Sequence, residues 1–589
     1  MHTQPTRDSF GLELFQGQLR PELFPPYPLA PGAEAEEFLG RLAGVLRAHV
    51  DPDAIDRDGE IPDEAIEALA GIGAFGIKIP REHGGLGLSQ LDYCRAIGLL
   101  ASHCSNTTVL LGAHQSIGVP QPLKLFGSPE QQARYFPRLA SGALSGFALT
   151  EAEAGSDPAA MTTTAALSAD GRHWVLNGEK LWCTNGTRAE LLVVIARTPD
   201  RQIKGQARKQ HTAFIVETAW PGVEVTQRCH FMGLRALYAG IVRFRDVQVP
   251  VQNVLGEVGS GLKLALTTLN AGRLTVPSAA MGSAKWCLRV ARRFAAERQQ
   301  WGKPIGQHEA VAHKLAWIAA HAFALEAMVT TTAALVDAGD ADVRVEAALC
   351  KLYASEVLWR IVNETMQIRS GAGYETAASL QARGQEPIGV ERLLRDARIN
   401  MIFEGTSEIM RLFLAREALG PHLARLKTLA KAPARERLGA GLHYATWYPG
   451  TWAPRLGGFA VDARLAPELE WAAAASRHLA RTLVHAMLRH GQKLAERQGL
   501  LGRCVEIGAE LYAVTAAVVR ADAVLRAGGP EADKALRMAT LFSGYARRRA
   551  EETFRALGDN QDAQALALAH DLLAGEHAWL EHGSVASEG

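Results

Sequence analysis

The residues best suited to chemistry include a carboxylate in apolar surroundings. Glu404 lies in the segment INMIFEGTSEIMRLFLARE, between apolar side chains and Gly405, which predicts a tight turn. Thr406 has the side chain of a helix N-cap, and an apolar helical stripe follows it. Removing a carboxylate from water raises its pKa, so Glu404 is predicted to be a base that works near neutral pH. Glu408 has an ordinary explanation as an acidic residue at a helix N-terminus.

A second motif suits the binding of a flat heteroaromatic cofactor. In KLWCTNG, Trp182 and Thr184 are two residues apart, and a β-strand places such residues on the same face. An indole that packs and a hydroxyl that hydrogen-bonds would together hold such a ring. A core tryptophan beside a solvated threonine is the alternative, and the motif alone leaves both interpretations open.

Two further motifs carry weaker signals. LTEAEAGSD (149–157) combines small residues with hydroxyls, and Gly155 permits its backbone N–H groups to approach a phosphate or an acceptor-rich ring. ERQQWGKPI contains Arg298 and Lys303, which can hold phosphate, and Trp301, which can stack. An ordinary polar turn and a solvated helix end are the respective alternatives.

The pattern along the chain predicts the elements that must position these residues. Residues 1–30 are irregular and contain several prolines, and amphipathic periodicity predicts a helical domain over 31–143. β-branched runs and turn dipeptides predict a β domain over 144–256. Helical periodicity returns over 257–424, as in a helix bundle, and continues in a C-terminal extension over 425–589. The predicted fold class is therefore α+β.

Composition excludes several classes of protein. The chain has 589 residues, of which 48% are hydrophobic and 21% charged, values typical of a folded soluble protein rather than a disordered one. Its net charge of +1 is too small for a general nucleic-acid binder. The seven cysteines include no CxxC pair, so we expect neither a disulfide framework nor a metal site. We expect no targeting peptide, no membrane-spanning helix and a cytoplasmic location.

The C-terminal extension is asymmetric in charge. Residues 425–503 hold 13 Lys and Arg against 5 Asp and Glu, a net charge of +8, whereas residues 504–589 hold 8 against 13, a net charge of −5. Glycines, prolines and aromatic residues between Gly439 and Gly458 predict a linker or docking segment. The basic half suits a peripheral membrane contact or a redox partner, and packing of its helices on the rest of the chain is the alternative.

Together, the four motifs and the helix–β–helix order resemble the acyl-CoA dehydrogenase family over about residues 35–425. The additional C-terminal helices and the start SFGLELFQGQL resemble the very-long-chain branch, which includes an assembly factor of the respiratory chain. The resemblance implies the family fold, with a four-helix bundle after the β domain. It also implies FAD-dependent oxidation of acyl-CoA thioesters to trans-2-enoyl-CoA, as in fatty acid β-oxidation.

In this family FAD lies between the β domain and the bundle, and several residues match its flavin-binding positions. By similarity, Trp182 packs on the isoalloxazine and Thr184 hydrogen-bonds near its N5 atom. Thr406 and Glu408 match positions that contact the phosphates or the adenine side of FAD. The other matching residues are Phe147, Leu149 and Thr150 at the pyrimidine edge, Gly155 and Ser156 at the pyrophosphate, and Arg298, Trp301, Gln367 and Gly371, which reach the FAD of a partner subunit.

The resemblance also implies a catalytic base and binding partners. Glu404 matches the base, and Arg273 matches an arginine that faces the substrate and the base. A minority of the family places the base just before this arginine, but that residue is Gly272 here and cannot act as one. An electron-transfer flavoprotein is the implied electron acceptor. FAD sites shared between subunits imply a homo-oligomer, and the additional C-terminal helices favour a homodimer.

Two other functions stay open on the sequence alone. A non-catalytic scaffold or assembly factor on the same fold would lack flavin, although Glu404, Trp182 and Thr184 are retained. An acyl-CoA oxidase would differ in letting oxygen reach the reduced flavin. Ala152 follows Glu151 where the family usually has proline, one of several departures that affect the contacts to FAD and to the substrate entrance.

Overall fold

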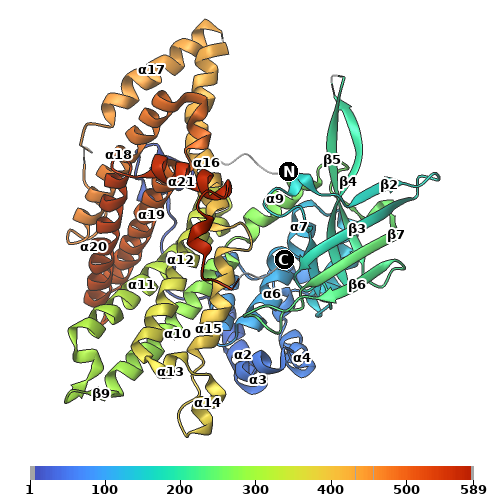
Figure 1. Ribbon diagram of the computed structural model, residues 1–589, viewed down its shortest axis with the longest axis horizontal. Helices are drawn as coiled ribbons and strands as arrows, with labels where there is room; N and C mark the ends of the chain where they lie inside the picture. Colours follow the sequence, from blue (N-terminus) through green and yellow to red (C-terminus); the bar gives the residue numbers. More distant parts are fainter. Residues whose placement is uncertain (1–6, 204, 432, 455–456, 586–589) are drawn as a thin grey trace.

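The chain folds into helical units on either side of a β domain in the sequence. The computed structural model describes residues 7–203, 205–431, 433–454 and 457–585. Figure 1 shows the β domain on the right and the C-terminal helices on the left, with the N-terminal helices next to the β domain. The predicted α+β fold class is confirmed.

Helices form the N-terminal unit, and side chains cap several of them. The Ser89 hydroxyl accepts the N–H of Asp92 at 3.1 Å, and Ser128 with Gln131 forms a capping box. These caps satisfy backbone N–H groups that the helices cannot pair internally. The helices are α1 (Phe10–Phe15), α2 (Ala33–His49), α3 (Pro52–Asp58), α4 (Asp63–Gly71), α5 (Gln90–Ala101), α6 (Ser105–Ser116), α7 (Pro120–Phe126) and α8 (Pro129–Ala140).

An eight-stranded sheet forms the middle unit, in the order β6-β7-β3-β2-β4-β5-β8, with β1 parallel to β4. Asp170 and Gly171 lie in the turn between β2 and β3, as their sequence predicts. Asn177 and Gly178 form a second turn dipeptide for which the sequence predicts a hairpin turn, but they lie inside β3, where the register slips and Gly178 has φ +144°. The strands are β1 (Ser145–Ala148), β2 (Thr164–Leu167), β3 (His173–Cys183), β4 (Leu191–Ile203), β5 (Gln206–Glu217), β6 (Val223–Arg228), β7 (Gly240–Pro250) and β8 (Val254–Leu255).

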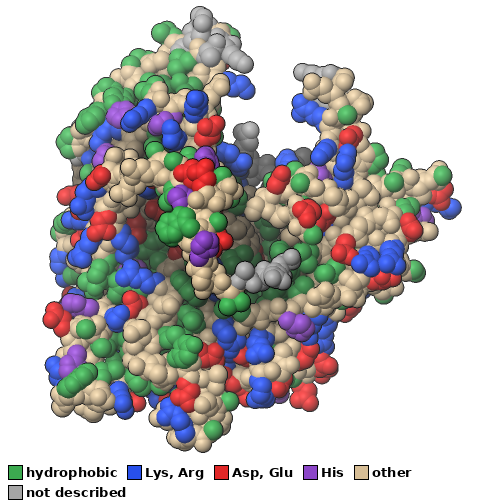
Figure 2. All heavy atoms as spheres, viewed as in Figure 1, with side chains coloured by type: hydrophobic (Ala, Val, Ile, Leu, Met, Phe, Trp, Pro, Cys, Tyr) green, Lys and Arg blue, Asp and Glu red, His purple; other side chains and the backbone are tan. Residues whose placement is uncertain are grey.

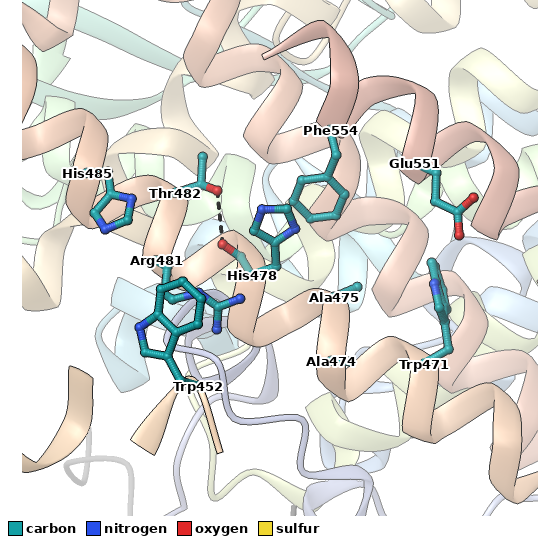
Figure 3. A pocket seen from close by; sticks show the side chains of 10 residues that line it. All are labelled: Trp452, Trp471, Ala474, Ala475, His478, Arg481, Thr482, His485, Glu551 and Phe554. Carbon is teal, nitrogen blue, oxygen red and sulfur yellow. Dashed lines mark hydrogen bonds between the residues drawn. The ribbon is translucent and has the colours of Figure 1, made fainter. Parts of the chain in front are cut away.

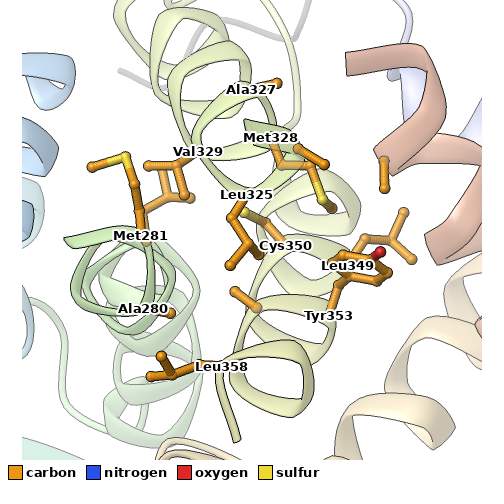
Figure 4. Close-up of a cluster of buried hydrophobic side chains, with 14 of the residues drawn as sticks. Ala280, Met281, Leu325, Ala327, Met328, Val329, Leu349, Cys350, Tyr353 and Leu358 are labelled. Atoms are coloured by element: carbon orange, nitrogen blue, oxygen red, sulfur yellow. The ribbon is translucent and has the colours of Figure 1, made fainter. Parts of the chain in front are cut away.

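A helix bundle follows, and its long helices share one apolar core. Met281, Leu325 and Leu349 come from three different helices and lie together in this core (Figure 4). α11 is long and apolar enough to cross a membrane, but 78% of its most apolar stretch is buried in the protein, as in a core helix. The helices are α9 (Gly261–Gly272), α10 (Thr275–Glu297), α11 (Glu309–Ala338), α12 (Arg344–Arg369), α13 (Gly371–Tyr374), α14 (Ala377–Ala382), α15 (Val390–Ala397) and α16 (Ser407–Lys431).

The C-terminal extension packs on this bundle. The Tyr512 hydroxyl lies 2.6 Å from Thr332 Oγ1 on α11, and Ser476 Oγ donates to Leu14 O at 2.6 Å. These buried bonds join the extension to both the bundle and α1. Its helices are α17 (Ala434–Gly450), α18 (Ala466–His490), α19 (Gln498–Ala527), α20 (Ala532–Ala556) and α21 (Asp562–Leu573).

The sequence predicts a linker or a docking segment over residues 439–458, and the linker alternative is wrong in its first half, because α17 continues to Gly450. Glycine lowers helix propensity, but tertiary contacts outweigh it here. Trp447 Nε1 donates to Gln16 O at 3.0 Å, and the Tyr444 hydroxyl lies 3.1 Å from His422 Nδ1. The aromatic residues thus attach α17 to α1 and α16.

Candidate active site

Glu404 lies on a strained turn just before α16. Its φ angle is +55° and that of Gly405 is +91°, so both residues occupy the left-handed region. A glutamate in this region costs about 1–3 kcal/mol, so its surroundings must hold it there. Thr406 Oγ1 accepts the N–H of Ile409 at 3.3 Å, which confirms the predicted N-cap. Lys351 Nζ donates to Gly405 O at 2.5 Å.

Burial desolvates the carboxylate of Glu404, although the residue as a whole is partly exposed. Its Oε2 atom is buried and has no hydrogen-bond partner in the described part of the chain. Burial raises the pKa of Glu404 above the ordinary carboxyl value, and the charges of Lys351 and Arg273 oppose that rise. Such a carboxylate can accept a proton at a pH where an exposed one would hold it too weakly.

Two buried cations accompany this carboxylate. Arg273, between α9 and α10, is 7% exposed, and its Nε and Nη1 atoms lack partners among the described residues. Its guanidinium lies 4.4 Å from the ring centroid of Phe413. Burial lowers the pKa of Arg273 to about 10, so it remains protonated at neutral pH. Lys351, on α12, is fully buried, and burial lowers its pKa as well.

The backbone N–H of Glu404 is also free for a ligand. No described residue accepts a hydrogen bond from it. A free N–H beside a catalytic carboxylate can hold a substrate oxygen on which charge develops.

Gly272 is excluded as a base on steric as well as chemical grounds. A Cβ at this position would lie 2.9 Å from Ser116 O and 3.0 Å from Ile117 Cγ2. No side chain fits there without movement of α6, and among the carboxylates that act on Arg273 the Glu404 carboxylate has the largest effect.

A buried ion pair anchors the loop after β1. Lys180 Nζ lies 2.8 Å from Glu151 Oε1 and donates to Leu149 O at 3.0 Å. Glu151 also accepts the N–H groups of Thr162, at 2.6 Å, and Thr163, at 3.0 Å. Burial raises the pKa of Glu151, but the bonds to Lys180 and the threonines outweigh it and lower the pKa to about 2. Glu151 therefore shapes the loop from inside.

The predicted cofactor residues of β1 and this loop differ in how far they are exposed to solvent. Phe147 is buried in the sheet core, whereas Leu149 and Thr150 are half-buried. Gly155 and Ser156 are exposed, and no atom of the residues that the structure describes lies within 4 Å of the place where a Gly155 Cβ would stand. The open backbone at Gly155 is what close approach of a phosphate requires.

The prediction that Trp182 and Thr184 share a strand face is wrong. β3 ends at Cys183, its register with β7 slips between Lys180 and Cys183, and Trp182 has φ +54°. Alternation does not hold across such a bulge, because the bulge re-aims the side chains. The Trp182 side chain is 57% exposed, and Thr184 starts the following turn half-buried.

These residues nevertheless fit FAD. Trp182 presents an exposed indole, and its positive φ angle is a conformation that costs free energy for a residue other than glycine. The backbone at Gly155 has free space beside it. Figure 2 shows a hollow between the helices and the β domain in which hydrophobic side chains are visible. The cofactor would therefore find apolar packing and accessible N–H groups where the family places it.

Arg298 and Trp301 flank β9 (Gln299–Gln300) just after the end of α10, and Figure 1 shows β9 away from β3. Trp301 and Gly302 form the two-residue loop of a hairpin between β9 (Gln299–Gln300) and β10 (Lys303–Pro304). Their φ angles are +48° and +78°, as a type I′ turn requires. Trp301 is 87% exposed, so the hairpin presents an indole to the surroundings.

Gln367 and Gly371 are exposed at the same end of the bundle. Their neighbour Arg369 lies with its guanidinium 5.0 Å from the ring centroid of Phe294, which connects the ends of α12 and α10. The structure thus brings these two residues towards the Trp301 hairpin. Within one chain it does not bring any of the four residues to the β domain, as Figure 1 shows for β9 and α13.

Thr406 and Glu408 have local roles at the start of α16. Thr406 is the N-cap, and Glu408 is exposed, with its pKa lowered by its own backbone N–H and then by Thr406. Lys351 is the functional candidate that the sequence analysis missed. Its signal is a lone lysine in the apolar run AALCKLYA of α12, since lysine is rarely fully buried.

A surface cavity of about 450 Å³ lies in the C-terminal extension (Figure 3). Among the residues that line this cavity, the Arg481 guanidinium lies 4.1 Å from the ring centroid of Trp452. The rings of His478 and Phe554 stack with 4.3 Å between their centroids. None of its lining residues belongs to the predicted site.

Models of acyl-CoA dehydrogenase domains match most of the chain. The N-terminal domain model matches residues 32–143, the middle domain model 146–247, and the C-terminal domain model 259–419. A fourth model, described as the ACAD9/ACADV C-terminal domain, matches residues 464–573. The additional helical unit is thus a family feature as well.

Individual proteins agree with these matches. "Probable acyl-CoA dehydrogenase FadE10" of Mycobacterium tuberculosis is 46% identical over 98% of this chain and 90% of its own length. The very long-chain specific acyl-CoA dehydrogenase of Rattus norvegicus is 33% identical over 95% of this chain and 85% of its own. A crystal structure of an acyl-CoA dehydrogenase with FAD from Bacillus anthracis covers 95% of this chain and 94% of its own, with 28% identity and a TM-score of 0.78. The chain therefore belongs to the acyl-CoA dehydrogenase family, as an FAD-dependent enzyme with the C-terminal domain of the very-long-chain branch.

Proposed function

We propose that this enzyme oxidises fatty acyl-CoA thioesters to trans-2-enoyl-CoA with Glu404 as the base for the α proton. The observation that carries the proposal is a buried carboxylate whose Oε2 atom has no hydrogen-bond partner among the described residues and which lies near two cations. FAD, when bound, supplies the acceptor for the hydride that leaves the β carbon.

The residues of this chain lower the barrier to proton removal. The carboxylate of Glu404 accepts the α proton, and the free N–H of Glu404 holds the thioester oxygen while charge develops on it. A preorganised donor of this kind is worth about 3–4 kcal/mol in a site without water. Arg273 keeps a positive charge beside the reacting groups, because its pKa of about 10 leaves it protonated.

The test of the base is Glu404→Gln. The amide has nearly the same shape, so folding and FAD content should persist, whereas it cannot accept the proton. We expect anaerobic flavin bleaching by acyl-CoA to slow by several powers of ten. Stopped-flow absorbance measures the rate of bleaching. A near-normal rate of bleaching in a folded variant that retains FAD would contradict the assignment of Glu404 as the base. The same assay with acyl-CoAs of increasing chain length would define which chain lengths the enzyme accepts.

We further propose that FAD is bound between two copies of the chain. Trp182, Thr184 and the loop from Phe147 to Ser156 would hold it from the β domain. The exposed residues Arg298, Trp301, Gln367 and Gly371 would reach it from the partner, since they lie apart from the β domain of their own chain. A homodimer is the expected assembly.

This assembly couples FAD to association. Because FAD would bind the dimer and not the monomer, dilution should release flavin and monomer together. Arg298→Ala should move that release to higher protein concentration. Light scattering with absorbance detection tests both statements, and a yellow monomer would overturn the shared site.

An electron-transfer flavoprotein is the proposed electron acceptor, and the cytoplasm is the proposed compartment. Substrate-dependent reduction of such a flavoprotein with little peroxide would support the acceptor. Stoichiometric peroxide would make the enzyme an oxidase instead. Fractionation of cells that produce the protein tests the compartment.

A peripheral membrane contact of the C-terminal extension is an additional proposal. The exposed leucines Leu438 and Leu442 on α17, 74% and 63% exposed, lie in the basic half of the extension and support it. Co-sedimentation with anionic vesicles, compared with neutral ones, is the test.

A further inference from the structure

Lys351 is a buried cation whose position is explained neither by apolar packing in the core nor by contact with water at the surface. Its side chain is 0% exposed in the middle of α12, among the apolar residues of the bundle. A buried ammonium is costly unless it is paired and hydrogen-bonded, so a lysine at this position needs a specific partner.

The partner lies on the turn that carries Glu404. Lys351 Nζ donates to the carbonyl of Gly405 at 2.5 Å, across 54 residues of sequence. This carbonyl belongs to the peptide directly after the Glu404–Gly405 bond, where both residues have positive φ. The bond therefore holds the C-terminal side of the strained turn against α12, while the N-cap at Thr406 holds the start of α16.

The charges around Lys351 point to the same turn. The groups that face it are Glu404 on the turn, Arg273 between α9 and α10, Glu356 on α12 and Glu408 on α16. Glu356 is already paired with Arg411, through bonds of 2.7 and 3.0 Å, and Glu408 is exposed. Glu404 is the group that favours the charged form of Lys351 most.

We propose that Lys351 is a positioning residue for the catalytic base: its ammonium fixes the Gly405–Thr406 peptide and thereby holds the turn that orients the Glu404 carboxylate. This inference rests on the proposed role of Glu404. A second consequence follows from the charge, because a nearby cation limits how far burial can raise the pKa of the base.

The experiment compares Lys351→Met and Lys351→Gln with the wild type. Methionine has a similar length and removes both the donor and the charge, whereas glutamine retains a donor without the charge. Lys314→Met is the matched control, because Lys314 on α11 pairs with Glu364 on α12 and does not contact the turn. FAD content and circular dichroism establish folding, and anaerobic flavin reduction by acyl-CoA is measured against pH.

We expect Lys351→Met to reduce flavin about 10²-fold more slowly at saturating substrate, the size of effect that a misplaced base produces. The half-saturating concentration should change little, because the fully buried lysine leaves no exposed surface for contact with the substrate. Lys351→Gln should recover part of the rate. In both variants the rising limb of the pH profile should move to higher pH, because loss of the cation raises the pKa of Glu404.

A rate and a pH midpoint like those of the wild type in folded, flavin-loaded Lys351→Met would overturn the inference. If that variant does not fold, the same criterion applies to Lys351→Gln. Glu404→Gln, measured in parallel, separates the two claims. If Glu404→Gln retains flavin reduction, the base assignment fails; if it loses reduction while the Lys351 variants stay normal, only the positioning role fails.

Discussion

Lys180 on β3 and Glu151 after β1 form a buried ion pair, with 2.8 Å between Nζ and Oε1 and side chains 0% and 5% exposed. The pair joins the loop that contains the predicted FAD residues to β3, the strand that includes Trp182 near its end. Charges so far from water are tolerated when they are paired, and each becomes costly when its partner is removed.

Glu151→Gln should therefore destabilise the protein by about 3–5 kcal/mol, because it leaves the Lys180 ammonium buried and poorly paired. Urea unfolding measures the loss. Glu179→Gln is the matched control, since Glu179 on the same strand pairs with Arg243 at the surface and should matter far less. Equal effects of the two substitutions would contradict the role of burial.

The same pair gives a prediction in acid. The folded protein holds the pKa of Glu151 at about 2, below its ordinary 4.5. A depressed carboxyl pKa stabilises the fold above pH 4.5 and loses that contribution as the pH falls towards about 2. The stability difference between wild type and Glu151→Gln should thus shrink over this window, and a constant difference would contradict the assignment.

Gly272 gives a prediction about where the base can be placed. Gly272→Ala should destabilise the protein by about 1–3 kcal/mol, because the new Cβ meets Ser116 O at 2.9 Å. Gly420→Ala on α16 is the control. In the described part of the chain no atom lies within 4 Å of the Cβ position at Gly420, so alanine should be neutral or stabilising there.

It follows that moving the base should fail. Glu404→Gly combined with Gly272→Glu should not regain flavin reduction, although some relatives place the base at the equivalent of position 272. Recovery of the rate in the double variant, relative to Glu404→Gly alone, would show that α6 can make room.

The sequence predicted what depends on local pattern. The N-cap at Thr406 and the tight turn at Glu404 follow from residue types within a few positions, and the structure has both. The prediction that Trp182 and Thr184 share a strand face is wrong, because β3 contains a bulge. The bulge depends on the pairing of β3 with β7 and cannot be recognised in the sequence KLWCTNG.

Long-range contacts explain the remaining differences. Residues 439–450 contain glycines and a proline that favour a linker, yet Trp447 binds Gln16, more than 400 residues earlier, and α17 forms. Lys351 could be noticed as a lone lysine in an apolar helix, but its bond to Gly405 could be found only from the fold.

The raised pKa of Glu404 predicts how activity depends on pH. The base works only when ionised, so flavin reduction should rise with pH through a midpoint above the ordinary 4.5 of a glutamate. Single-turnover reduction at saturating acyl-CoA reports this ionisation in the complex. A rate that is already maximal at pH 4.5 would contradict the desolvated environment of the carboxylate.

The Trp301 hairpin separates a structural role from a binding role. Trp301 has φ +48° and is 87% exposed, so its side chain adds strain and little packing within the chain. Trp301→Gly should relieve the strain and leave the free energy of unfolding unchanged or about 1 kcal/mol higher, since glycine favours this conformation. At the same time it should remove an indole that the proposed dimer places on FAD, so flavin should dissociate at higher protein concentration.

Trp579→Gly is the control, because Trp579 is 62% exposed but lies outside the hairpin. Serial dilution with flavin fluorescence measures the release, and a Trp301→Gly dimer that retains flavin like the wild type would show that the indole serves another contact.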